Sequence, residues 1–472
     1  MRQIEHHYIN GAFVASHGRG TADLHNPATE AVIGQVRLGD ATDAAAAIAA
    51  AHAALPAQAA RSVAERLEQL SRYRDAMAAR KDALREAIIE EYGAPSARSQ
   101  WMAEHPVQVI EDAMTVLRQF PFERQVGQAR VRLLPVGVAG LITPWNSNAS
   151  FICGKLATAL AAGCTAVVKP SEMSALQTQV VMEALHAAQL PAGVANIVNG
   201  LGEDVGAALS ASPAIAKISF TGSTGTGRAI LRASADTFKR TTLELGGKSP
   251  TILLDDADPA QAALLAVQAG FMNSGQACIA GTRILVPESR RAAFEAALTA
   301  AVQAVRSGDP TDPQTDVGPM VSARQWQRVQ GYIHTGLAEG ARLLAGGEGR
   351  PQGLPQGWFV RPTLFTDVRN DMTIAREEIF GPVLSIIGYR DDEDAIAIAN
   401  DTTYGLSALV IGTDRERAGR VARRIQSGRV LVNTLAHEPL APFGGMKQSG
   451  IGRESGAWGL EAFLEPQTVL EG

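Results

Sequence analysis

The strongest constraint on the fold is a series of short, apolar, β-branched segments that alternate with segments of helical composition. These short segments are VGVAGLI at 136–142, TAVVK at 165–169, NIV at 196–198 and KISF at 217–220. Strands separated by helices are typical of βαβ units, whose strands form a parallel sheet. A second alternating stretch begins near Ser249 and ends near Asn433. The sequence therefore predicts an α/β fold with two or more packed domains, as expected for 472 residues.

The region before the first of these strands is predicted to be helical. Thr42 to Leu117 is rich in Ala, Glu, Arg and Leu at helical spacing, and Gly93 and Pro95 interrupt it. The chain has 46% hydrophobic residues, but no apolar run approaches the roughly twenty residues that cross a bilayer. The N-terminus also lacks the basic and apolar parts of a secretory signal. These features predict a soluble, cytoplasmic protein with no membrane partner.

Charge and cysteine content narrow the classes of function. The 43 basic and 48 acidic residues leave a net charge of −5, and no basic run marks a nucleic-acid surface. We therefore expect no nucleic-acid partner. The cysteines are Cys153, Cys164 and Cys278, an odd number without CxxC or Cys/His spacing. The sequence thus predicts reduced thiols, with neither a disulfide framework nor a metal site.

Three polar residues stand in segments that suit nucleophilic catalysis. Cys278 lies between Gly275 and Gly281, which allow close approach of backbone and ligand, and a thiolate attacks carbonyl groups well. Glu244 ends a predicted strand ahead of two glycines, where burial would raise its pKa toward that of a useful base. Asn146 follows Thr-Pro-Trp in a turn and can donate to an oxyanion. Taken singly, each has a plain structural interpretation as a core cysteine, an edge charge or a turn residue.

Two further segments suit a dinucleotide. FTGSTGTG at 220–227 follows a strand and opens a helix, so it can accept a pyrophosphate, although its spacing departs from GxGxxG. Lys169 and Glu172, at the end of the TAVVK strand, can hydrogen-bond an adenosine ribose. A carboxylate there would repel a 2′-phosphate, which favours NAD⁺ over NADP⁺. The Ser171-Glu172 pair is equally natural as a helix cap.

Taken together and in this order, these segments resemble the aldehyde dehydrogenase superfamily over nearly the whole chain. The motifs that carry the resemblance are PWN, KPSE, FTGSTGTG, ELGGKSP, GQACIAGTR, EEIFGPV and PFGGMKQSGIGRE. The resemblance implies a Rossmann-like dinucleotide-binding domain (1–119 and 138–245) and an α/β catalytic domain (246–433). It also implies a small β bridging element (120–137 and 454–472) that builds a homodimer or homotetramer.

The resemblance assigns roles to individual residues. Cys278 matches the nucleophile, Glu244 the general base, and Asn146 the oxyanion donor, assisted by the backbone N–H of Cys278. The implied reaction is NAD-dependent oxidation of an aldehyde to a carboxylic acid through a thiohemiacetal and a thioester, which water activated by Glu244 hydrolyses. The residues that match cofactor contacts are Ile142, Trp145, Lys169, Ser171, Glu172, Gly202, Phe220, Gly222, Ser223, Gly246, Glu378 and Phe380.

Departures from common members of the family concern the substrate. Ser147 follows PWN where an aromatic residue and proline are common, and Gly154 stands where a large aromatic residue is frequent. A roomier, more polar tunnel is therefore expected, suited to a bulky or polar-tailed aldehyde or semialdehyde rather than acetaldehyde. The predicted substrate pocket comprises Ser147, Phe151, Gly154, Lys155, Ile279, Leu435, His437 and Phe443.

Three other functions compete with this interpretation. A CoA-acylating aldehyde dehydrogenase would intercept the same thioester with CoA, but Glu244 in its ELGGK setting favours hydrolysis. A non-catalytic structural member would be expected to lack Cys278, Glu244 or Asn146, and all three are present. A simple phosphate-binding module would leave Cys278 and Glu244 without a role.

Overall fold

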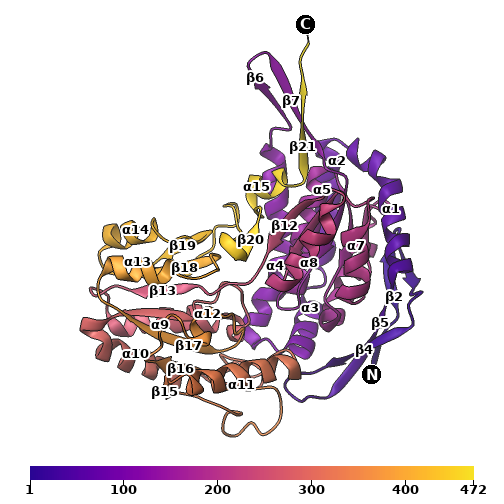
Figure 1. Ribbon diagram of the computed structural model, residues 1–472. Helices are drawn as coiled ribbons and strands as arrows, with labels where there is room; N and C mark the ends of the chain where they lie inside the picture. Colours follow the sequence, from indigo (N-terminus) through magenta and orange to yellow (C-terminus); the bar gives the residue numbers. More distant parts are fainter. Residues whose placement is uncertain (472) are drawn as a thin grey trace.

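Two large sheets dominate the structure, which is a computed structural model that describes residues 1–471 (Figure 1). The first sheet has eight strands in the order β20-β12-β11-β8-β9-β10-β2-β3. Its five central strands are parallel: β12 (Arg240–Glu244), β11 (Lys217–Thr221), β8 (Val138–Ile142), β9 (Thr165–Lys169) and β10 (Ala195–Ile197). At its edges lie the antiparallel strands β20 (Gly450–Ile451), β2 (His6–Ile9) and β3 (Ala12–Ala15). The four apolar segments of the first alternating stretch thus form neighbouring strands of one parallel sheet, as predicted.

Helices cover both faces of this sheet because its central strands are apolar on both sides. Along β8, Ala139 and Leu141 belong to one buried cluster, whereas Val138 and Ile142 belong to another. Alternation of this kind follows from the two-residue repeat of a strand. The first cluster includes residues of α2 (Val63–Ala78), α4 (Ser96–Gln119), α5 (Asn148–Ala162) and α6 (Ala175–Ala188), and the second includes residues of α1 (Ala41–Ala59), α7 (Ala207–Ala211) and α8 (Thr224–Ala235).

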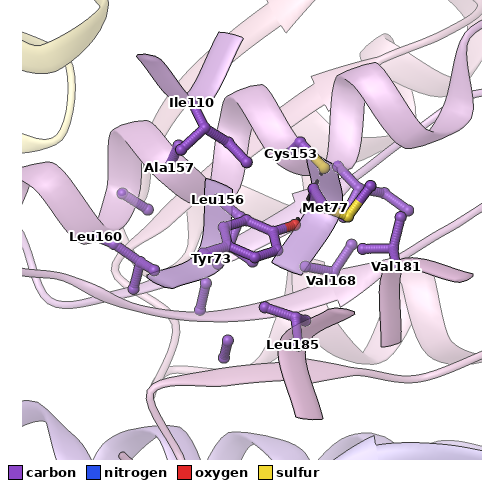
Figure 2. Close-up of a cluster of buried hydrophobic side chains, with 14 of the residues drawn as sticks. Tyr73, Met77, Ile110, Cys153, Leu156, Ala157, Leu160, Val168, Val181 and Leu185 are labelled. Atoms are coloured by element: carbon purple, nitrogen blue, oxygen red, sulfur yellow. Dashed lines mark hydrogen bonds between the residues drawn. The ribbon is translucent and has the colours of Figure 1, made fainter. Parts of the chain in front are cut away.

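Figure 2 shows the centre of the first cluster, around the fully buried Tyr73 of α2. The Tyr73 hydroxyl is hydrogen-bonded to the Sγ atom of Cys153 on α5 at 3.1 Å, which gives the buried hydroxyl the partner it requires. Burial raises the pKa of Cys153 to about 12 and that of Cys164 to about 11. Both thiols are therefore inert core residues, as their small and apolar sequence surroundings predict.

The second large sheet has seven strands, all parallel to their neighbours except the edge strand β15. In spatial order they are β15 (Arg342–Ala345), β16 (Thr363–Thr366), β17 (Val383–Tyr389), β14 (Arg283–Pro287), β13 (Pro250–Leu253), β18 (Ser407–Ile411) and β19 (Arg429–Val432). The helices that share its two buried clusters are α9 (Pro259–Phe271), α10 (Arg291–Gln303), α11 (Ala323–Ala338), α12 (Thr373–Arg376), α13 (Asp392–Asn400) and α14 (Arg415–Ala422). The second alternating stretch of the sequence therefore forms this sheet.

Two three-stranded sheets complete the fold. One consists of β1 (Arg2–Ile4), β5 (Val32–Leu38) and β4 (Gly20–His25). The other consists of β21 (Leu464–Val469), β7 (Ala129–Pro135) and β6 (Glu123–Val126), and it projects from the body at the top of Figure 1. The strand-like pieces at the two borders of the predicted bridging element thus pair with each other. Gly472, the last residue of that element, lies outside the described residues, and the division into three domains stays a prediction.

The helical region before the first parallel strand agrees with the sequence. It contains α1, α2, α3 (Lys81–Ala87), a π-helix, η1 (Ile88–Tyr92), and α4. Gly93 ends η1 with φ of 77°, a left-handed conformation that glycine adopts without strain. None of the helices formed by residues 1–471 combines the length and apolar character needed to cross a membrane.

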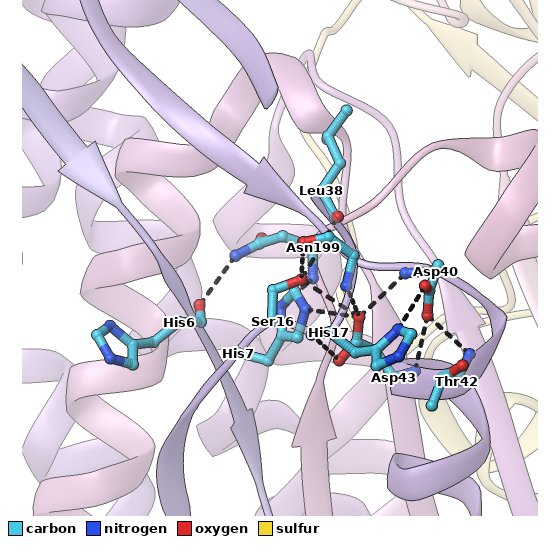
Figure 3. Close-up of polar contacts among 10 residues, drawn as sticks. His6, His7, Ser16, His17, Leu38, Asp40, Thr42, Asp43 and Asn199 are labelled. Carbon is cyan, nitrogen blue, oxygen red and sulfur yellow. Dashed lines mark hydrogen bonds and ion pairs between the residues drawn. The ribbon is translucent and has the colours of Figure 1, made fainter. Parts of the chain in front are cut away.

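A buried carboxylate ties the N-terminal strands to the start of α1 (Figure 3). Asp43 accepts hydrogen bonds from the backbone N–H groups of His17, Gly18 and Asp40 at 2.8, 3.0 and 3.1 Å. The Nε2 atom of His7 lies 3.6 Å from the same carboxylate. Burial by itself would raise the pKa of Asp43, but the backbone donors hold it below its usual value. Asp43 therefore serves as a fixed anion that satisfies buried N–H groups.

We expect Asp43→Asn to lower the free energy of unfolding by about 1–3 kcal/mol, because an amide presents an N–H group to donors that need an acceptor. Urea denaturation followed by circular dichroism would measure the shift of the midpoint. The control is Asp75→Asn, since Asp75 forms only an exposed ion pair with Arg74. Equal midpoints for the two variants would show that the Asp43 carboxylate has no structural role.

Candidate active site

The three residues predicted to carry out the chemistry line one cavity of about 410 Å³. Glu244 is the last residue of β12, and Asn146 lies in the loop between β8 and α5. Cys278 lies between α9 and β14 of the other large sheet. The cavity therefore lies where the two sheets meet, and residues far apart in the sequence face it together.

An unusual backbone conformation shapes the loop that carries Cys278. Asn273, Ser274 and Gly275 have consecutive φ angles of 56°, 59° and 73°, all in the left-handed region. The preceding helix α9 ends at Phe271, so these residues lie outside it. A Cβ atom on Gly275 would lie 2.3 Å from the backbone of Gly381, so only glycine fits there. Strain of this kind persists only where surrounding contacts impose it.

Hydrogen bonds supply those contacts and join the loop to the first sheet. The Nδ2 atom of Asn273 donates to the carbonyl oxygens of Asn146 and Gln276 at 3.0 and 3.2 Å. The Oγ atom of Ser274 accepts from the N–H of Gly318 at 2.9 Å. In return, the Nδ2 atom of Asn146 donates to the Gln276 carbonyl oxygen at 2.9 Å. An amide has two N–H groups, so Asn146 keeps one for a ligand in the cavity.

The Glu244 carboxylate is buried, and within the described part of the chain neither of its oxygens has a hydrogen-bond partner. Burial raises its pKa well above the usual value, and the negative charge of Glu454 acts in the same direction. The positive charges of Lys155 and Arg453 oppose this shift. A carboxylate with these properties is a stronger base than an exposed one, and its oxygens are free to bind water.

The Cys278 thiol is partly accessible from the cavity. Burial by protein on its other sides raises the pKa of Cys278 to about 12, and the carboxylates of Glu378 and Glu244 contribute to the increase. Arg429 acts in the opposite direction. Only a small fraction of the thiol is therefore ionised at neutral pH in the free protein.

The predicted cofactor contacts gather mainly at the carboxyl ends of the parallel strands. Lys169 ends β9, and its Nζ atom lies 3.4 Å from the Oε2 atom of Glu172. Gly222 follows β11, and a Cβ atom there would lie 2.4 Å from the Phe220 ring, which would have to move for a larger residue. Ser223 caps α8 by accepting from the Thr226 N–H. The remaining predicted contacts in this region are Ile142 at the end of β8, Ser171 capping the 3₁₀ turn of Glu172–Ser174, and Gly202 at the start of the π-helix η3 (Gly202–Gly206).

The predicted contacts on the nicotinamide side lie close to Cys278. The Oε1 atom of Glu378 accepts from the Gly247 N–H at 3.0 Å, and a Cβ atom on Gly246 would lie 2.6 Å from the other carboxylate oxygen. Burial raises the pKa of Glu378 to about 7. The rings of Phe380 and Trp145 meet edge to face with centroids 5.3 Å apart. The Glu378 carboxylate is thus packed closely against Gly246 and Gly247.

All eight residues of the predicted substrate pocket line the cavity. One of them, Lys155, points toward the Glu244 side, where its Nζ atom donates to Ser219 Oγ at 2.9 Å and forms an ion pair with Glu454. Sequence reasoning missed a further wall formed by α4. Its cavity-lining residues are Arg98, Trp101, His105, Val109, Asp112, Ala113 and Val116. Apart from the adjacent pair Asp112 and Ala113, their spacing of three or four residues was the available signal, because it identifies one face of a helix.

The sequence matches the family model for the aldehyde dehydrogenase family over residues 13–469. A relative from Staphylococcus haemolyticus, whose name assigns it to the aldehyde dehydrogenases, is 45% identical over 470 residues, 99% of each chain. A relative from Staphylococcus aureus with the same assignment is 44% identical over 470 residues, again 99% of each chain.

Solved structures give the same result. A mutant of aldehyde dehydrogenase C from Pseudomonas syringae, complexed with NAD⁺ and octanal, is 43% identical with a TM-score of 0.97, covering 99% of this chain and 96% of that one. An aldehyde dehydrogenase from Mycobacterium tuberculosis complexed with NAD⁺ is 39% identical with a TM-score of 0.95, covering 100% and 98%. At these identities the likeness extends to the family, and the α/β fold expected from the resemblance is confirmed.

Alkylation by iodoacetamide would test the environment of the thiol. Because a pKa of about 12 leaves the thiolate a minor species, we expect the alkylation rate to rise about tenfold per pH unit between pH 7 and pH 10. Mass spectrometry should locate the label on Cys278, and Cys278→Ala should remain unlabelled because Cys153 and Cys164 are buried. A rate that levelled off below pH 9 would contradict the raised pKa.

Proposed function

The chain belongs to the aldehyde dehydrogenase family, and we propose that it oxidises an aldehyde to the carboxylic acid with NAD⁺ as hydride acceptor. The observation that best supports the hydrolytic form of this reaction is a single cavity lined by a thiol, an amide N–H and a carboxylate without partners. These groups supply a nucleophile, an oxyanion donor and a base.

The first step is addition of the Cys278 thiolate to the aldehyde carbon. The new C–S bond forms as the carbonyl π electrons move to oxygen, so negative charge develops on that oxygen. The second Asn146 N–H and the backbone N–H of Cys278 stabilise it, a type of contact worth about 3 kcal/mol per donor. The Gln276 carbonyl oxygen orients Asn146 by accepting its other N–H at 2.9 Å.

The residues at the carboxyl ends of the parallel strands fit NAD⁺. Lys169 and Glu172 would bind the adenosine ribose, and the turn of Gly222 and Ser223 at the N-terminus of α8 would bind the pyrophosphate. Glu378, held by the Gly247 N–H, would bind the ribose next to nicotinamide. The chemistry that NAD⁺ supplies when bound is acceptance of the hydride from the Cys278 adduct, which leaves a thioester on sulfur.

Glu244 then acts as the general base for hydrolysis. Its carboxylate takes a proton from water as the water oxygen adds to the thioester carbon, and the Cys278 thiolate leaves with the electrons of the C–S bond. Burial without hydrogen bonds makes Glu244 basic enough for this task. The raised pKa of Glu244 also predicts that hydrolysis slows as pH falls, because the protonated carboxyl cannot accept a proton.

The main alternative is transfer of the acyl group from Cys278 to CoA. The position of Glu244 on the cavity wall favours water as the acyl acceptor. If CoA took the acyl group, Glu244 would have no water to deprotonate.

The substrate is proposed to be a bulky or polar-tailed aldehyde or semialdehyde. In support, Ser147 and Gly154 line the cavity, and their small side chains leave room in it.

Assembly and location complete the proposal. The projecting sheet of β6, β7 and β21 supports assembly into a homodimer or homotetramer, because every residue of β6 is exposed in the single chain. Val126 and Leu470, at the ends of this sheet, are 61% and 69% exposed.

A cytoplasmic location stays a prediction, and the three free cysteines are consistent with it.

Two substitutions separate the two chemical steps. We expect Cys278→Ala to abolish NADH formation, because no nucleophile remains. Glu244→Gln should give a burst of about one NADH per active site, followed by turnover slower by about 10²–10⁴-fold, because the thioester forms but is not hydrolysed. Stopped-flow absorbance of NADH measures both phases.

The control for these variants is Glu183→Gln, an exposed change on α6 that should leave both phases unchanged. Full turnover by Glu244→Gln would contradict the base assignment. If turnover by the wild type required added CoA, the hydrolytic mechanism would be wrong and acyl transfer to CoA would replace it.

Glu172→Ser tests the preference for NAD⁺. Removing the carboxylate removes its repulsion of a 2′-phosphate and frees Lys169 to bind one, so the kcat/KM ratio of NADP⁺ to NAD⁺ should rise by about tenfold. Steady-state kinetics with each dinucleotide at saturating aldehyde give this ratio. A ratio equal to that of the wild type would show that Glu172 does not discriminate between the two dinucleotides.

A further inference from the structure

The α4 wall of the cavity carries a cation that forms no ion pair with the described residues. Arg98 faces the cavity together with Trp101 and His105. Its guanidinium carbon lies 4.0 Å from the centre of the Trp101 ring, and its buried Nε atom has no hydrogen-bond partner. Burial lowers the pKa of Arg98, opposed only by Tyr92, but an arginine remains charged at neutral pH. Among residues 1–471, no carboxylate forms an ion pair with it within 4.0 Å.

A second arginine faces the same space from the opposite sheet. Arg429, at the start of β19, lines the cavity and lies close enough to Cys278 to influence its pKa. The Nε atom of Arg429 donates to Ser407 Oγ at 3.3 Å. Lys155, which is buried at the cavity wall, is already neutralised by Glu454. The part of the cavity between α4 and β19 therefore contains two guanidinium groups and little negative charge.

The remaining titratable groups here do not neutralise these arginines. Asp112 accepts a hydrogen bond from Gln108 at 2.8 Å, and burial raises its pKa. Burial also lowers the pKa of His105 to about 4, with Arg98 and His437 contributing to the decrease. The pKa of His437 is lowered by burial and by Arg429, while Asp112 and Glu438 act in the opposite direction. Both histidines are therefore neutral at pH 7.

Arg98 is half-buried, and withdrawing a charge even partly from water has a cost that an opposite charge or several hydrogen bonds recover. Arginine in particular matches the two oxygens of a carboxylate with a pair of parallel N–H groups. The same cavity lining includes the apolar residues Val109, Phe151 and Ile279, which suit a carbon chain. One cavity thus combines a nucleophile, apolar wall residues and a cation without a carboxylate partner among the described residues.

We propose that the substrate is an aldehyde with a carboxylate at its far end, and that Arg98 binds this carboxylate while the aldehyde group reaches Cys278. This proposal rests on the proposed function and specifies its substrate class. Arg98 is then a specificity-determining residue on α4 that takes no part in the chemical steps. Its loss should weaken binding of anionic aldehydes and leave neutral ones almost unaffected.

The experiment compares aldehydes that differ only in charge. The pairs are 4-oxobutanoate with 4-methylpentanal and 6-oxohexanoate with 6-methylheptanal, since an isopropyl group has the shape of a carboxylate. We expect the better anionic aldehyde to have a kcat/KM at least about tenfold above its neutral isostere in the wild type. Arg98→Met should reduce that ratio by about tenfold or more, mainly through KM, and Arg98→Lys should retain part of it.

Arg118→Met provides the matched control. Arg118 is on the same helix, but it is exposed and paired with Glu111, so the ratio should not change. Unchanged turnover of the neutral isosteres by Arg98→Met would show that the variant folds. A wild-type ratio near one, or an equal ratio in wild type and Arg98→Met, would overturn the proposal.

A second readout does not depend on turnover. Adipate, a dicarboxylate without an aldehyde group, should slow alkylation of Cys278 by iodoacetamide in the wild type and at least about tenfold less effectively in Arg98→Met. If no aldehyde yields NADH but this Arg98-dependent protection is present, the proposed function fails while the anion subsite stands. Protection that is absent, or identical in the two proteins, overturns the subsite.

Discussion

The active site depends on the exchange of hydrogen bonds between the Asn146 turn and the strained loop before Cys278. Asn273 donates to the Asn146 carbonyl oxygen, and Asn146 donates to that of Gln276. Neither segment is part of a regular helix or strand that would hold its conformation. Without these contacts, the left-handed residues Asn273, Ser274 and Gly275 would relax to a less strained backbone. Because each segment belongs to a different sheet, the same bonds also fix the relative position of the thiol and the oxyanion donor.

Burial then sets the chemical character of the groups that this arrangement brings together. It raises the pKa of Glu244, Glu378 and Cys278, since each would lose hydration on ionisation. A high pKa makes Glu244 a better base, but it leaves little thiolate at Cys278. The positive charge of Arg429 lowers the thiol pKa and partly offsets that cost. One low-dielectric cavity thus favours the base directly and needs a nearby cation for the nucleophile.

Helix α4 shows how one element contributes to both stability and specificity. Its buried residues Met102, Ile110 and Met114 pack in the core beside the eight-stranded sheet, while Arg98, Trp101, His105 and Asp112 line the cavity. The 3.6-residue repeat separates the two faces, so the cavity face can change without disturbing the core. Substrate preference can therefore vary on a helix whose position is fixed by packing.

The sequence by itself determined the family, both parallel sheets and the segments that bear Cys278, Glu244 and Asn146, because strand patterns and contiguous motifs are local features. The tertiary structure alone decided that the Arg98 Nε atom has no hydrogen-bond partner among the described residues, that Lys155 turns toward Glu454, and that α9 ends before Asn273. Charge pairing, burial and strain depend on which distant residues come into contact. Sequence order does not specify those contacts, since close packing settles them only when the sheets and helices meet.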